Sequence, residues 1–289
     1  MTAARDAMPT GHVLGSATVL GVLGVLALIA VGVERHPASI QGDGNSLLWT
    51  DVTLLLMYGV AATWVSYQRR ADVHTVIRIG TITGLLLGVV HVANHLVESF
   101  VPVRNFALVI TPVFLVLALL GFTGSAAWGR TRSLAMAVVA GVWCAIVATL
   151  ITLCVVMVLN LSFESRAELW LRKSFAASGM NDPGAFLVKN TLEAASEALV
   201  RMPVVALFLS LISASANAWI VERSRRFVFA AACFALPTFA MGAAALWYAN
   251  LLQRSARPPF VMVGVVLASI TISIAHPIWS ALLQGRQNE

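Results

Sequence analysis

Apolar residues run along nearly the whole chain in long stretches, separated by short groups of polar, glycine and proline residues. Each stretch is about 20 residues or longer, the length that an α-helix needs to cross about 30 Å of hydrocarbon. The pattern therefore predicts an all-α fold, a polytopic membrane bundle of about eight transmembrane helices that forms a single transmembrane domain over residues 1–289. The predicted spans lie near residues 12–33, 46–67, 77–98, 104–127, 134–159, 185–222, 227–250 and 260–283.

The connection over residues 160–184 is amphipathic rather than uniformly apolar. Its apolar residues recur at helical spacing as Phe163, Ala167, Trp170, Leu171 and Phe175, and charged residues fill the opposite face. We expect one interfacial helix here, lying on the extracytoplasmic membrane surface or covering the bundle as a lid. In the turn that follows, Asp182 is expected to cap the next helix and Pro183 to be its first residue.

The positions of arginine orient the predicted bundle, because positive residues of short loops remain on the cytoplasmic side. With both termini inside, that side holds Arg5, Arg69, Arg70, Arg78, Arg130, Arg132, Arg223, Arg225, Arg226 and Arg286. The short connections of the other side hold only Arg35, Arg104, Arg254 and Arg257. This asymmetry, with the heavy use of arginine over lysine, favours a multi-pass protein of a bacterial inner (cytoplasmic) membrane, N-in and C-in. We interpret the first apolar run as a retained helix, although Pro37-Ala38-Ser39 leaves cleavage open.

Composition agrees with lipid as the main solvent of this chain. Hydrophobic residues make up 59% and charged residues 11%, whereas about 25% of the residues of a soluble domain are charged. The net charge of +6 comes from arginines at the ends of apolar runs, so a nucleic-acid partner is not expected. The three cysteines also lie inside apolar runs and are interpreted as small buried hydrophobic residues.

The third predicted span contains most of the candidate functional residues. Gly80, Gly84 and Gly88 form a ridge of small residues that allows a neighbouring helix to approach closely. Steps of three and four residues continue this face through His91 and His95 to Glu98, with Asn94 beside them. The sequence therefore predicts a polar seam that faces other helices near the extracytoplasmic boundary.

This seam admits several interpretations. Two histidines four residues apart, with Glu98 as a third ligand, suit one divalent transition metal such as zinc, iron or copper. Asp51 of the second span is expected at a similar depth, and Glu193 and Glu197 overhang the same side. The same groups also fit a proton-handling site, a substrate site, or polar residues that only bond to each other or to interfacial water.

Four predicted spans also contain a proline, which removes one backbone hydrogen bond and favours a kink. These prolines are Pro112, Pro203, Pro237 and Pro277.

Three functions remain open on these observations. The first is a small-molecule or ion permease, or an accessory membrane subunit of one. The second is a membrane-embedded metal-binding protein or enzyme, although Val92 after His91 rules out an HExxH metalloprotease motif, and a non-enzymatic role is favoured. The third is a non-catalytic assembly or sensor subunit. Under each of them, the expected partners of the chain are the lipid bilayer and either a second copy or other membrane subunits.

Overall fold

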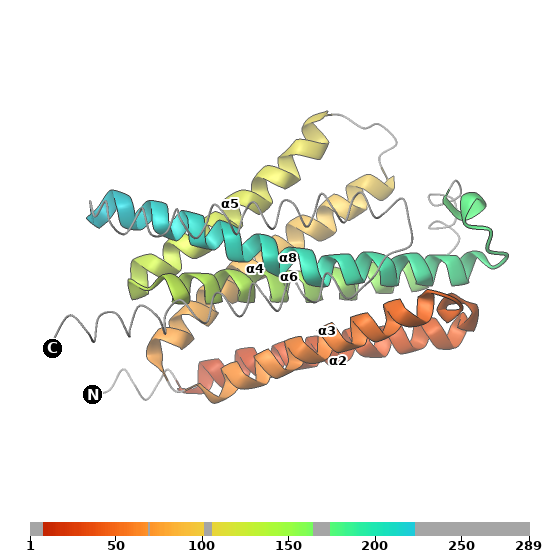
Figure 1. The fold of residues 1–289 in the computed structure, drawn as a ribbon, viewed down its shortest axis with the longest axis horizontal. Helices are drawn as coiled ribbons and strands as arrows, with labels where there is room; N and C mark the ends of the chain where they lie inside the picture. The colour runs from red at the N-terminus through yellow and green to blue at the C-terminus, as the bar shows by residue number, and fades with distance from the viewer. Residues whose placement is uncertain (1–7, 69, 101–105, 164–173, 223–289) are drawn as a thin grey trace.

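The computed structural model describes residues 8–68, 70–100, 106–163 and 174–222 (Figure 1). Every regular element in these ranges is helical, and no strand occurs among the described residues. This confirms the all-α class. The two spans predicted over 227–250 and 260–283 lie outside the described residues, as does most of the predicted interfacial helix.

The helices follow one another along the chain and extend somewhat beyond the apolar runs. In order they are α2 (Met8–Arg35), the short 3-10 helix η1 (Pro37–Ile40), α3 (Gly44–Tyr67), α4 (Ala71–Phe100), α5 (Phe106–Thr131), α6 (Leu134–Ser162) and α8 (Pro183–Glu222). Residues 174–178 are also helical. The connections from α2 to α3 and from α6 to α8 lie at one end of the bundle, which we call the η1 end (Figure 1). Those from α3 to α4 and from α5 to α6 lie at the opposite end (Figure 1).

Five of these helices, α2, α3, α4, α6 and α8, are long and apolar enough to cross a membrane. Their outward faces carry large apolar side chains: Leu20 is 68% exposed, Val60 70% and Val89 63%. Such apolar surfaces are stable in contact with lipid, whereas their exposure to water is unfavourable. The described part of the chain is therefore that of a helical membrane protein.

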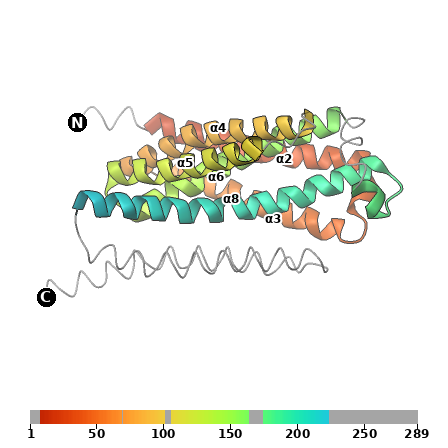
Figure 2. The same cartoon turned by 90° about the horizontal axis from the view of Figure 1, so that it is seen from above.

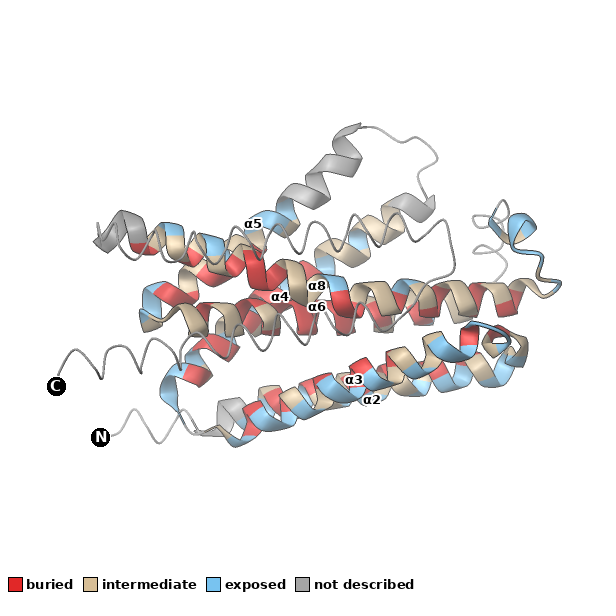
Figure 3. Ribbon diagram, viewed as in Figure 1, coloured by how far each residue is buried: buried red, intermediate tan, exposed pale blue. Residues whose placement is uncertain are grey.

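Helix α6 lies at the centre of the bundle and contacts α4, α8, α5 and α2. Its buried residues are mostly small, with Ala140, Cys144, Ala145 and Ala148 all fully buried. Both views show α8 running alongside it (Figures 1 and 2). Burial is concentrated where helices face one another, and the outer faces of α2 and α3 are exposed (Figure 3).

Glycines bring α4 into backbone contact with α6. A Cβ atom placed on Gly80 would lie 2.6 Å from the carbonyl oxygen of Ala140, and one on Gly84 would lie 2.7 Å from that of Cys144. Between these positions the indole Nε1 of Trp143 donates to the hydroxyl of Thr81 at 2.9 Å. Close backbone approach and an interhelical hydrogen bond together hold this pair, as expected where lipid supplies no hydrophobic drive for helix association.

The N-terminus of α8 is capped as the sequence predicts. The backbone N–H of Gly184 donates to Oδ1 of Asp182 at 2.9 Å, and Pro183 is the first residue of the helix. Nδ1 of His36 lies 3.5 Å from Oδ2 of the same carboxylate. A side chain at position 184 would overlap the imidazole ring of His36, so glycine at this position lets the ring keep its place beside Asp182.

Two further contacts join the same end of the bundle. Lys189 on α8 pairs with Asp43 just before α3, and the ring of Phe175 packs on Phe186 with 5.6 Å between centroids. The α2–α3 connection is therefore joined to the start of α8 by the contacts of His36 with Asp182 and of Asp43 with Lys189, and the aromatic contact joins residues 174–178 to α8.

The charge of Asp182 is expected to make the η1 end sensitive to acid. The backbone N–H groups of Ala185 and Gly184, with His36, hold the pKa of this carboxyl below its usual range. A lowered native pKa gives stability that is complete above the ordinary pKa of about 4 and is lost as the pH falls through the native value. Thermal unfolding in detergent at neutral pH and at about pH 3 should therefore show a smaller loss of midpoint in Asp182→Asn than in the wild type.

The two substitutions at Asp182 separate charge from capping. Asparagine keeps the side-chain acceptor of the cap, whereas Asp182→Ala removes it and should cost about 1 kcal/mol at neutral pH. The carboxylate is 47% exposed, so solvent screening keeps its charge effect small. An unchanged acid sensitivity in both variants would contradict the assignment.

Candidate functional site

Asp51 is a fully buried carboxyl group within the membrane-spanning helix α3. Its exposed fraction is 0%, and it shares a buried helix face with Leu54, Leu55 and Tyr58. Removing a carboxyl group from water is costly unless hydrogen bonds or an opposite charge compensate. The partners of Asp51 therefore decide whether this residue has a purely structural role.

Only one oxygen of Asp51 has a partner among the described residues. The hydroxyl of Ser196 on α8 donates to Oδ1 at 2.5 Å, across 145 residues of sequence. Oδ2 is buried and accepts no hydrogen bond within the described part of the chain. The carboxyl group is thus held in place at one oxygen and left unsatisfied at the other.

Apolar core residues lie within one helical turn of this pair on both helices. On α3 the core includes Leu54 and Leu55, and Leu48 packs against it. On α8 the residues that flank Ser196, namely Leu192, Ala195 and Leu199, are each 1% exposed and belong to the same core. The unsatisfied oxygen therefore lies in a region of low polarity, where an unpaired charge is most expensive.

A second polar contact joins the same two helices two turns further along α3. The hydroxyl of Tyr58 donates to the backbone carbonyl of Leu199 at 2.6 Å, and both residues are buried. That carbonyl would normally accept from the N–H of residue 203, but Pro203 stands there and has no N–H. Tyr58 replaces the backbone donor that the proline removes.

Two separate polar contacts thus join α3 and α8, and we call them together the α3–α8 seam, defined as Asp51, Tyr58, Ser196, Leu199 and Pro203. Asp51 and Tyr58 are seven residues apart on α3, as are Ser196 and Pro203 on α8. A spacing of seven places residues on the same helix face. The seam therefore combines a buried carboxyl group with a point where the backbone of α8 lacks one hydrogen bond.

The sequence pattern singled out Asp51 and Pro203 but not Ser196 or Tyr58. A tyrosine seven residues after a buried aspartate is a weak signal for a shared face. No signal in the sequence links Asp51 or Tyr58 to α8, because their partners there lie more than 140 residues away in the sequence.

The structure places Asp51 apart from the histidines of α4. Helix α3 packs on α2 and α8, whereas α4 packs mainly on α6 and α5. His91, Asn94 and His95 are half-buried on the last turns of α4, and the side chain of Glu98 lies outside the described residues. Gly88 continues the glycine contact with α6, since a Cβ there would lie 3.1 Å from Ile151.

The remaining predicted acids lie on α8 near the seam. Glu193 is half-buried, and Glu197 pairs with Arg201 one turn further along at 3.0 Å, the pairing expected from their spacing. Among the described residues, no group of three or more histidine, cysteine, aspartate or glutamate side chains is arranged to hold a metal ion. The chemistry that the described residues support best is therefore that of a single buried carboxyl group.

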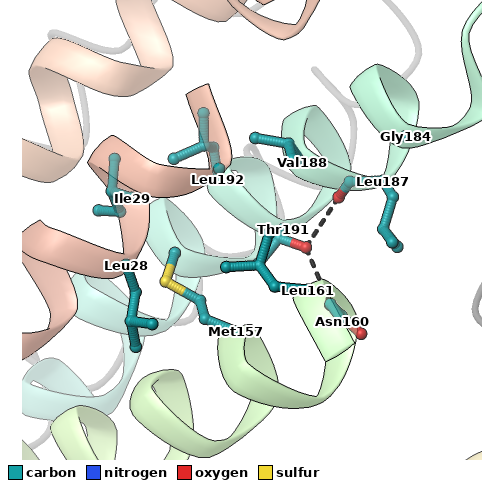
Figure 4. A pocket seen from close by; sticks show the side chains of 11 residues that line it. Leu28, Ile29, Met157, Asn160, Leu161, Gly184, Leu187, Val188, Thr191 and Leu192 are labelled. Atoms are coloured by element: carbon teal, nitrogen blue, oxygen red, sulfur yellow. Dashed lines mark hydrogen bonds between the residues drawn. The ribbon is translucent and has the colours of Figure 1, made fainter. Parts of the chain in front are cut away.

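A pocket lies one helical turn from Ser196, between α2, α6 and α8 (Figure 4). The pocket is small, with room for about one water molecule. Most of its lining is apolar, and its polar corner consists of Asn160, which donates to Thr191 at 3.0 Å, while Thr191 donates to the carbonyl of Leu187 at 2.8 Å. Leu192 lines the pocket and lies four residues before Ser196, so the pocket and the seam share one face of α8.

Comparisons with known proteins find no match to this chain among family models, curated proteins or solved structures.

Proposed function

We propose that this protein is a proton- or cation-coupled permease for a small molecule or ion, or the membrane subunit that provides the coupling. The observation that carries this proposal is Asp51: it is fully buried in a spanning helix, yet one of its oxygens has no partner among the described residues. Ionisable groups inside membrane bundles are costly, and they typically mark ion pathways and proton relays.

The arrangement around Asp51 supports a coupling role in two ways. Binding of a positive ion to the carboxylate would remove the cost of its charge, so the stability of the α3–α8 contact depends on occupancy. Pro203 then provides a place where α8 can change direction with little loss of backbone hydrogen bonding. A change of occupancy at Asp51 is thereby linked to the relative position of two spanning helices.

The proposed location is a bacterial inner membrane, with the η1 end on the extracytoplasmic side. In support, Arg70, Arg130 and Arg132 lie in or beside the connections at the opposite end (Figure 1). Short loops that carry arginine remain in the cytoplasm. Helix α3 then begins at the extracytoplasmic side, and Asp51, seven residues after Gly44, lies in its outer half.

Transport by purified protein in proteoliposomes tests this function. Vesicles that contain a pH-sensitive or sodium-sensitive dye are exposed to a panel of candidate substrates, and ion movement that depends on substrate is recorded. We expect the Asp51→Asn variant to lose this coupled movement, because asparagine has the shape of the carboxyl group but no exchangeable charge.

The matched control for this assay is Glu197→Gln, which removes a carboxylate one residue from Ser196. Glu197 is 43% exposed and paired with Arg201, so it lies outside the seam and its removal should leave coupled movement intact. Coupled ion movement in Asp51→Asn at the wild-type rate would overturn the proposed role of Asp51.

A further inference from the structure

The position of the unsatisfied oxygen restricts which ion Asp51 can hold. Oδ1 already accepts from Ser196, so an incoming ion meets Oδ2. The core residues within one turn of Asp51 and Ser196 are apolar. Among the described residues, an ion at this oxygen therefore meets very few oxygen ligands.

Metal cations need more ligands than the described residues provide. Calcium takes about six to eight oxygen ligands and magnesium about six, and channels that strip alkali cations of water replace the hydration shell with rings of carbonyl oxygens. Among the described contacts, the seam offers the carboxylate of Asp51 and the hydroxyl of Ser196. A proton needs only one acceptor, and Oδ2 is that acceptor.

Charged groups on the neighbouring elements do not take the place of such an ion. On α8 the two cations, Lys189 and Arg201, are paired with Asp43 and Glu197, and Glu193 adds a negative group. Helix α2 has no titratable residue between His12 and Glu34, and η1 has none, while His36 pairs with Asp182. On α3 itself the hydroxyl of Tyr58 donates to Leu199. Within the described part of the chain, a proton is therefore the group that can neutralise Asp51.

We propose that the coupling ion is a proton, bound on Oδ2 of Asp51 while α3 and α8 are in contact and released when they separate. This inference rests on the proposed function and deepens it. In the binding step a proton from water forms an O–H bond with a lone pair of Oδ2, which gives a neutral carboxylic acid whose Oδ1 still accepts from Ser196. In the release step the same O–H bond breaks, the proton returns to water, and water hydrates the carboxylate.

Infrared difference spectroscopy of the full-length protein with isotope-labelled aspartate tests this directly. We expect a carboxylic acid C=O band that shifts with the label and disappears in Asp51→Asn. In Ser196→Ala the band should remain but its frequency should change, because Oδ1 has lost its hydrogen-bond donor. Glu197→Gln should leave the band unchanged. The Ser196→Ala shift also identifies the band if Asp51→Asn folds poorly.

Sodium and potassium provide the opposing test. At constant pH and ionic strength, replacing choline chloride with either salt should leave the acid band unchanged. Loss of the band on adding sodium or potassium would overturn the inference, as would the absence of an Asp51-dependent acid band at neutral and acidic pH.

The infrared experiment tests the proton site, and the transport experiment tests the permease function, so either proposal can be contradicted without the other. An acid band at Asp51 without substrate-dependent proton movement would support the proton site and contradict the permease. Sodium-coupled transport that requires Asp51, without an acid band, would support the permease function. It would overturn the inference that the coupling ion is a proton.

Discussion

Replacing Gly84 with leucine is expected to separate α4 from α6 and to lower the free energy of unfolding by about 3 kcal/mol, at the upper end of the cost of overpacking. A Cβ at this position would lie 2.7 Å from the carbonyl oxygen of Cys144 and 2.9 Å from Cβ of Val147. The nearest obstacle is backbone, so the clash is relieved only by moving a helix. Equilibrium unfolding in mixed micelles measures the loss.

The matched control is Gly129→Leu on α5. A Cβ at Gly129 meets nothing within 4 Å among the described residues. The same substitution there should leave stability unchanged or raise it slightly, because leucine favours the helix more than glycine does. Equal losses in both variants would show that the close approach of α4 and α6 is not the cause.

Replacing Tyr58 with phenylalanine is expected to lower the free energy of unfolding by about 1–3 kcal/mol, the cost of a buried carbonyl left without a donor. The ring remains and only the hydroxyl that donates to Leu199 is lost. In a Pro203→Ala background the loss should be much smaller, since the restored N–H of residue 203 can donate to the same carbonyl. The interaction energy from this double-mutant cycle measures how far Tyr58 replaces the missing backbone donor.

Tyr67→Phe serves as the control for the hydroxyl itself. Tyr67 is 74% exposed at the end of α3, so removal of its hydroxyl should change the free energy of unfolding very little. A Tyr58→Phe cost that is the same with proline or alanine at position 203 would contradict the donor-replacement account.

Within the seam, the sequence identified individual candidate residues but not which residues contact each other. Asp51 was identifiable because hydropathy and topology predict how deep a residue lies in a membrane. The same reasoning grouped Asp51 with His91 and His95, which share its predicted depth. Depth is one coordinate, however, and it does not say which helices are neighbours: α3 packs on α8, and α4 packs on α6.

The sequence by itself determined the properties that depend on nearby residues: the helical class, the apolar runs and the cap of Asp182 on α8. Each follows from periodicity or from spacing of a few residues. Only the tertiary structure decided that Ser196 meets Asp51 and that Tyr58 satisfies the carbonyl freed by Pro203. Those pairings depend on how whole helices fit together, because in lipid the choice of neighbour follows from shape complementarity and polar contacts across distant segments, which no local pattern records.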